Sequence, residues 1–156
     1  KTGSSPEVYN VGCLGKIINF NETNDGRFII NLSGITRFKI KEEVNSKKLY
    51  RKFKVDYSDF SQDLDNKNSE IKNYNKDHLL KKIKLFFNKI NYSVGVNELE
   101  QLNFDQLIST VCMILPFTAI EKQNLIEKIT IEDKVDALEK IINFNLVDLH
   151  ENKTIQ

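Results

Sequence analysis

The chain has 156 residues, 40% of them hydrophobic, and its 23 Lys and Arg nearly balance its 22 Asp and Glu. This length and apolar content suffice for a hydrophobic core in one or two small domains. The near-neutral charge excludes a strong field that would attract nucleic acid or an anionic membrane. Nearly all basic residues are Lys rather than Arg, the better phosphate ligand, and no apolar run approaches the roughly 18 residues of a membrane span. We therefore expect neither nucleic acid nor a membrane as the partner.

Residues 9–40 contain two runs in which apolar residues recur at every second position. A period of two is typical of strands with one buried face. Asn24-Asp25-Gly26 separates the runs, and these residue types accept the left-handed backbone angles of a tight turn. The stretch therefore predicts a β-hairpin with Gly26 in its turn and a bulge or bend at Gly34. The apolar positions are Tyr9, Val11, Cys13 and Ile17 in the first run and Phe28, Ile30 and Leu32 in the second.

A third strand is predicted where Phe53, Val55 and Tyr57 alternate with charged residues. A charged face is typical of an edge strand, because charge prevents pairing with other chains. Over residues 58–76 the composition shifts to Asp, Asn, Ser and Lys, which leaves too little apolar surface for strong order beyond a helical turn. We expect a β-rich domain over residues 1–60 and a polar linker over residues 61–76.

Beyond residue 76 the apolar period changes to about 3.6, which indicates a bundle of α-helices over residues 77–145. Asp77 is the expected cap of the first helix, and the last helix is expected to run through Asn143 into a polar tail over residues 146–156. The residues expected to pack together in this bundle are Leu79, Ile83, Phe86, Phe87, Val111, Leu115, Leu125, Leu138 and Ile141.

Stop and start signals separate the central helices of this bundle. Asn103 is placed to cap a helix that Pro116 ends, because proline lacks an amide donor and clashes with the preceding turn. Thr118 and Glu121 have the spacing of a capping box, in which each side chain satisfies an exposed backbone N–H. The two signals predict one helix that ends before Pro116 and a second, short helix that begins after Thr118 and runs to about Lys128.

Two sets of residues, one in each half of the chain, form ordered patterns. The first set is a strand, an Asp-Gly turn, a second strand, a glycine and then Arg-aromatic-x-Ile, and its residues are Gly12, Ile17, Asp25, Gly26, Gly34, Arg37 and Ile40. The second set is a Leu-Pro pair followed by a helix similar to Lys-Gln-x-Leu-Leu-Glu, and its residues are Leu115, Pro116, Lys122, Gln123, Leu125 and Glu127. In this order, the two sets resemble the Lon protease N-terminal (substrate-binding) domain family.

The resemblance implies an α+β fold, with a small PUA-like twisted β domain followed by an α-helical bundle. It also implies that strands belonging to the β domain are missing from the N-terminal side of this sequence. Within the matched residues, Arg37 has the fork geometry to tie a strand to a loop or a carboxylate. Gln123 and Glu127 are i,i+4 partners, and we expect Lys122 and Glu127 each to bond a neighbouring element within a buried or interdomain polar network.

No group of residues forms a catalytic or cofactor-binding motif. Residues 12–17 lack the leading Gly and the Ser or Thr of a phosphate-binding loop. Neither His78 nor His150 lies in a segment that would hold a base beside a nucleophile, and no spacing suits a metal site. The Ser-Lys peptidase and nucleotide-binding domains of Lon proteases are not in this sequence. We therefore expect no enzyme activity, no metal and no cofactor.

The two cysteines, Cys13 and Cys112, lie in different expected elements. Free cysteine behaves as a small apolar residue, and disulfides are rare in the reducing cytoplasm. We expect two reduced, buried thiols in a cytoplasmic protein. A disulfide between the two halves is the alternative.

The resemblance implies a non-catalytic module that recognises unfolded or exposed apolar segments of other polypeptides. An apolar surface, or a sheet edge that accepts an extended strand, would be the physical means. Phe20, Phe28 and Phe38 are the candidate polypeptide-binding residues, with core packing the expected role of the last two. An AAA+ protease or a second copy of the chain is a further possible partner. The alternatives are an N-terminal fragment of an ATP-dependent Lon protease and an RNA-contacting PUA-like domain.

Overall fold

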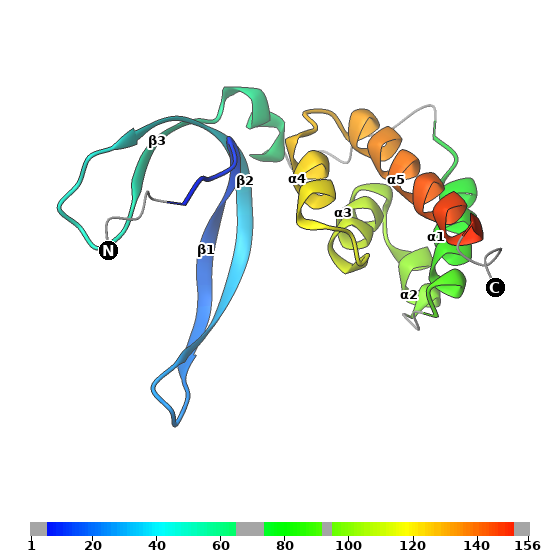
Figure 1. Cartoon of the computed structure of the whole chain (residues 1–156), viewed down its shortest axis with the longest axis horizontal. Coiled ribbons are helices and arrows are strands. Elements are labelled where there is room, and N and C mark those ends of the chain that lie inside the picture. Colours follow the sequence, from blue (N-terminus) through cyan, green and yellow to red (C-terminus); the bar gives the residue numbers. More distant parts are fainter. Residues whose placement is uncertain (1–5, 65–73, 92–94, 152–156) are drawn as a thin grey trace. The chain divides into compact units, whose positions relative to one another are not determined.

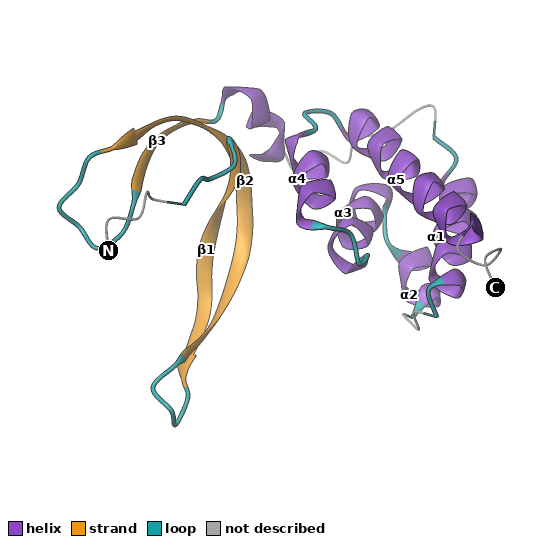
Figure 2. Ribbon diagram, viewed as in Figure 1, coloured by secondary structure: helices purple, strands orange, loops and turns teal. Residues whose placement is uncertain are grey.

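The computed structural model describes residues 6–64, 74–91 and 95–151. The chain divides into two compact units, Lys1–Lys67 and Asn68–Gln156. The described part of the first unit consists of strands and a 3-10 helix, whereas α-helices make up that of the second (Figure 2). The predicted α+β class is confirmed.

The first unit contains an antiparallel sheet with the strand order β1-β2-β3. Its strands are β1 (Val11–Glu22), β2 (Phe28–Val44) and β3 (Lys52–Asp56). The predicted hairpin is β1–β2, and β3 pairs only with the Lys39–Val44 part of β2. The rest of the hairpin therefore extends past β3 as a ribbon of two strands (Figure 1).

The turn between β1 and β2 is formed at the predicted residues. Gly26 has a φ of 78°, in the left-handed region that glycine adopts without strain. Its N–H donates to the Thr23 carbonyl at 2.9 Å, and the Thr23 N–H donates to the Arg27 carbonyl at 2.7 Å. The side chain of Arg27 also donates from Nε to Oδ2 of Asp25 at 2.7 Å. The prediction of a hairpin turn that depends on Gly26 is confirmed.

A bulge interrupts the pairing of β1 with β2 close to Gly34. Gly15 lies opposite Gly34, but its neighbour Leu14 lies opposite Thr36. This register leaves Ile35 as an extra residue on β2. Since an extra residue bends a strand and increases its twist, the irregularity predicted at Gly34 is confirmed.

A 3-10 helix, η1 (Ser58–Leu64), follows β3 and packs on β2. Its Phe60 is fully buried, with a relative exposure of 0%. The polar composition after residue 58 predicts few contacts there, but in the structure this segment packs on the sheet. The single aromatic residue is enough to anchor the segment, because one buried Phe removes a large apolar area from water.

The second unit is a helical bundle around one apolar core. Its helices are α1 (Lys76–Lys89), α2 (Val96–Gln101), α3 (Phe104–Ile114), α4 (Ala119–Glu127) and α5 (Ile131–Glu151). Every residue expected in the core of this bundle is buried, except Ile141, which is half-buried and packs against the core. The helical period of the sequence therefore identified the correct faces.

The central helices have the predicted caps. The Gln106 N–H donates to the Asn103 side chain at 2.9 Å at the start of α3, and the Glu121 N–H donates to Thr118 Oγ1 at 3.2 Å at the start of α4. Helix α3 ends at Ile114, two residues before Pro116. These boundaries are local in origin, which is why the sequence predicts them.

The cap of α1 differs from the prediction. Asn75 is the cap and accepts a hydrogen bond from the His78 N–H at 3.1 Å, whereas Asp77 lies in the first helical turn. Both residue types suit a cap, but a carboxylate in the first turn is also stabilised by the helix dipole. The expectation that Asp77 is the cap was wrong by two residues.

The last helix also differs from the prediction. It continues past Asn143 to Glu151 instead of giving way to a tail. Leu146 packs against the core, and the Lys89 ammonium donates to its carbonyl. These contacts with α1 support the additional turns, which the sparse apolar residues of this segment did not reveal.

Candidate functional site

One face of the β1–β2 ribbon carries five large apolar side chains, which we call the hairpin face. Ile17 lies opposite Leu32 and Phe20 lies opposite Ile30, so each pair projects from the same side of the ribbon. Phe28 is two residues from Ile30 on β2 and therefore shares that side. The five side chains are between 51% and 64% exposed.

The two aromatic residues of the hairpin face are neighbours. The ring centroids of Phe20 and Phe28 are 6.4 Å apart, and the ring planes meet at 53°. Aromatic pairs at such distances attract each other through complementary ring edges and faces. The hairpin therefore holds a paired aromatic surface close to its turn.

The exposure of the hairpin face corrects the expectation that this alternation marks a buried side. Phe28 was expected in a core and is instead 57% exposed. The alternation correctly identifies one apolar face, but burial also requires an element that covers it. β3 pairs with the far end of β2, and η1 packs there as well. Within the described residues of the first unit, the hairpin face has no such cover.

Phe38, the third aromatic candidate, does not belong to this face. It is half-buried, and its ring meets that of Tyr57 edge-on, with centroids 6.1 Å apart. A Cβ on Gly12, its partner across the hairpin, would lie 2.7 Å from Cζ of the Phe38 ring. A side chain at Gly12 would therefore displace the Phe38 ring. The expectation that Phe38 packs inside the domain agrees with its partial burial.

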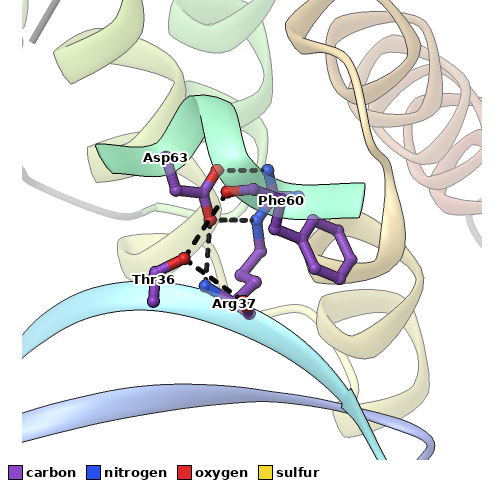
Figure 3. A network of polar contacts seen from close by, with 4 residues as sticks. All are labelled: Thr36, Arg37, Phe60 and Asp63. Atoms are coloured by element: carbon purple, nitrogen blue, oxygen red, sulfur yellow. Dashed lines mark hydrogen bonds and ion pairs between the residues drawn. The ribbon is translucent and has the colours of Figure 1, made fainter. Parts of the chain in front are cut away.

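Arg37 forms the most buried polar network of the first unit (Figure 3). Its Nε donates to Oδ2 of Asp63 at 2.8 Å, its Nη2 donates to Oδ1 at 2.6 Å, and its backbone N–H donates to Oδ2 at 3.0 Å. The guanidinium carbon is 4.4 Å from the centroid of the Phe60 ring. Thr36 adds a hydrogen bond from Oγ1 to the Phe60 carbonyl at 3.5 Å.

This network confirms that Arg37 ties a strand to a carboxylate. The carboxylate belongs to Asp63, which falls in the stretch expected to be a polar linker and was not anticipated as a partner. The aromatic Phe60 in an otherwise polar segment is the signal that could have found it. The bidentate pair fixes η1 against β2 beside the bulge, next to the hairpin ribbon.

The Lys122–Glu127 segment of α4, which carries the second set of matched residues, is bonded to α3. Lys122 Nζ donates to the Met113 carbonyl at 2.9 Å, and Gln123 Nε2 donates to Glu127 Oε1 at 2.8 Å. The predicted i,i+4 pair and the predicted bond to a neighbouring helix are both present. Lys122 and Glu127 are exposed, so of the two expected kinds of network the buried one was wrong. The lysine supplies a donor for a carbonyl at the end of α3, where no helical amide follows.

The two cysteines of the described residues lie in different units. Cys13 is exposed, which corrects the expectation of a buried thiol, and Cys112 is half-buried; both are free. Burial raises the pKa of the Cys112 thiol to about 11, which keeps it protonated and unreactive near neutral pH. Among the described residues, no cluster of His, Cys, Asp and Glu has an arrangement that could hold a metal ion.

The turn beside the hairpin face carries an ion pair between Arg27 and Asp25, and Glu22 lies opposite Phe28 at the end of β1. Hydrogen bonds from Arg27, which has the larger effect, and from Thr23 lower the pKa of the Asp25 carboxyl to about 2. The carboxylate is therefore ionised and paired with Arg27 at neutral pH.

None of the helices in the described part of the chain is both long enough and apolar enough to cross a bilayer.

Comparison of the sequence with protein families identifies the family to which the chain belongs. The model of the family described as the ATP-dependent protease La (LON) substrate-binding domain matches residues 1–143. The match spans the whole sheet, η1 and helices α1 to α4, together with most of α5. It therefore includes the hairpin face, the Arg37–Asp63 pair and the Leu-Pro turn. A search of the curated proteins finds no match.

Proposed function

Since the chain belongs to the family of the ATP-dependent protease La (LON) substrate-binding domain, we propose that it binds unfolded or exposed apolar segments of other polypeptides. Substrate recognition is the general role of this family. The exposed apolar side chains of the hairpin face support apolar segments as the feature of a polypeptide that is recognised. The module would hold a client polypeptide without performing chemistry on it.

The observation that carries the proposal is the hairpin face itself. Isolated exposed apolar residues are ordinary on protein surfaces, but contiguous ones mark sites of interaction. The hairpin face contains two adjacent cross-strand pairs, Ile17 with Leu32 and Phe20 with Ile30. Phe28 extends this exposed surface toward the turn. Aromatic side chains supply much of the binding energy in such contacts, because they bury a large area at a small entropic cost.

A ribbon of two strands also gains stability when its apolar face is covered. Two-stranded hairpins are marginally stable in water, and a third layer or strand is needed for independent stability. A bound apolar segment would supply that cover and would be stabilised by the same contacts. An unfolded polypeptide offers such segments, whereas a folded one has buried them.

The test measures binding of the full chain to a reduced, carboxymethylated polypeptide and to the same polypeptide in its folded, oxidised form. Fluorescence anisotropy should show binding to the unfolded form only. The double substitution Phe20→Ser with Phe28→Ser should weaken that binding by about tenfold or more, because two aromatic contacts are lost. Met113→Ser, which removes a side chain that is 72% exposed on the helical unit, is the matched control and should leave binding unchanged.

Circular dichroism of each variant checks that the fold is retained. Equal binding of the folded and unfolded forms would contradict the proposal. A double variant that is folded and binds as the unchanged chain does would place the binding surface elsewhere.

A further inference from the structure

The turn of the hairpin contains the one Asp-Gly pair of the sequence, Asp25-Gly26. An aspartate that precedes glycine is prone to isomerisation, because glycine has no side chain to hinder attack by its own backbone nitrogen. In this chain the other five glycines follow Thr2, Val11, Leu14, Ser33 and Val94. Asp25 is therefore the aspartate of the chain whose neighbour leaves it most open to this reaction.

The reaction consists of the loss and the return of one water molecule. The Gly26 nitrogen attacks the side-chain carboxyl carbon of Asp25, so a bond forms between N and Cγ. The amide proton and the carboxyl OH leave together as water, and the product is a cyclic imide. Water then opens the ring at Cγ, which restores aspartate, or at the backbone carbonyl carbon, which leaves isoaspartate. Neither step needs an oxidant or a reductant.

Hydrogen bonds in the folded turn oppose the first step at the carboxyl group. Oδ2 of Asp25 accepts from Arg27 Nε at 2.7 Å and also pairs with Nη2 of Arg27. Oδ1 accepts from Thr23 Oγ1 and, at 3.4 Å, from the Arg27 N–H. The carboxyl must be protonated for its oxygen to leave as water. The same hydrogen bonds lower its pKa to about 2, so the protonated form is scarce at neutral pH.

The turn also engages the attacking nitrogen. The Gly26 N–H donates to the Thr23 carbonyl at 2.9 Å, and this is the proton that must be lost when the ring closes. All of these contacts lie within residues 23–27, so no other segment of the chain is needed to form them. The side chain of Asp25 is 50% exposed, so water for the second step has access to it. The site is therefore open to solvent but held in an unreactive form.

We propose that Asp25 is a site of spontaneous isoaspartate formation, and that Arg27 and Thr23 hold the folded turn in a form that suppresses it. Arg27 and Thr23 are positioning residues, because they fix the reacting groups without taking part in the bond changes. Isoaspartate would add one carbon to the backbone of the turn, so the hydrogen bonds between Thr23 and Arg27 would lose their alignment. This modification is independent of the proposed binding function.

The experiment ages the full chain at neutral pH in water labelled with heavy oxygen. Mass spectrometry of the peptide that contains Asp25 measures label uptake, because each opening of the imide adds one labelled oxygen. Fragmentation of the same peptide distinguishes isoaspartate from aspartate. The folded chain should react more slowly than the chain unfolded in guanidinium by about tenfold or more. Arg27→Gln should raise the rate of the folded chain by about tenfold or more, because the protonated carboxyl becomes more abundant as its pKa returns toward 3.8.

Lys16→Gln is the matched control, since it removes a cation from β1 of the same hairpin without touching the turn, and it should leave the rate unchanged. Hydrogen exchange of the β1 and β2 amides shows whether Arg27→Gln loosens the whole hairpin. A rate increase that merely follows a loss of this protection, or that Lys16→Gln reproduces, would overturn the role of Arg27. An Arg27→Gln variant that reacts no faster than the unchanged chain would do the same. Folded chain that takes up label as fast as unfolded chain would overturn the proposal as a whole.

Discussion

The guanidinium of Arg37 holds both carboxylate oxygens of Asp63, a residue 26 positions later in the chain, at 2.8 Å and 2.6 Å. The two side chains are only 10% and 19% exposed. The same carboxylate also accepts the backbone N–H of Arg37, so one acidic side chain satisfies both the strand edge and its arginine. The contact therefore joins η1 to the sheet at the point where β3 no longer covers β2.

Arg37→Lys should lower the free energy of unfolding of the β-sheet unit by about 1–3 kcal/mol, the usual effect of losing charge-assisted hydrogen bonds. Lysine keeps the charge but cannot donate two parallel bonds or lie over the Phe60 ring in the same way. Urea unfolding measures the loss. Arg27→Lys is the control, because its pair with Asp25 is exposed at the turn and should contribute less. Equal effects of the two substitutions would show that the buried pair has no special role.

Gly26→Val should destabilise the hairpin by about 1–3 kcal/mol, since a β-branched residue is strained at a φ of 78°. Gly26→Asn is the matched control and should cost less, because Asn tolerates left-handed angles. A Cβ added at this position would have no neighbouring atom within 4 Å, so steric crowding does not contribute. The melting temperature should fall further in the valine variant than in the asparagine variant. An unchanged value for the valine variant would show that the backbone angle is not required.

The sequence predicts the elements of this fold because their signals are local. The Asn-Asp-Gly turn, the Asn103 and Thr118 caps and Pro116 each act within a few residues, and the helical period identifies the core of the second unit. The end of α5 was missed because it depends on contacts with α1 rather than on a stop signal.

The candidate site was predicted less completely. Alternation shows that Phe28, Ile30 and Leu32 share a face, but whether a face is buried depends on which elements lie over it. The same limit applies to Asp63, whose partner is far away in sequence. The sequence indicates Phe20 and Phe28 as aromatic residues near a turn, and only the register of the strands brings them together with Ile17 and Leu32.

The Asp25 carboxyl should titrate with a pKa of about 2 in the folded chain, compared with its ordinary 3.8, because Arg27 and Thr23 donate hydrogen bonds to the charged form. A lowered pKa means that its contribution to stability is complete above about 3.8 and is lost as the pH falls through about 2. An NMR titration of the Asp25 carboxyl carbon measures the midpoint. Arg27→Gln should move it toward 3.8. An ordinary midpoint in the unchanged chain would contradict the pairing at the turn.

Phe87→Ala should lower the free energy of unfolding of the helical unit by about 3–5 kcal/mol, the usual cost of emptying a buried aromatic site. Phe87 is 1% exposed in the core, whereas Leu85 of the same helix is 60% exposed, so Leu85→Ala is the matched control with a small expected effect. Because the residues of the core cluster that contains Phe87 all belong to the helical unit, the loss should fall on helical amides. Hydrogen exchange should show those amides losing protection while the amides of β1 and β2 keep theirs. Uniform loss in both units would mean that they unfold as one cooperative structure, and the division of the chain into a β-rich and a helical domain would then be wrong.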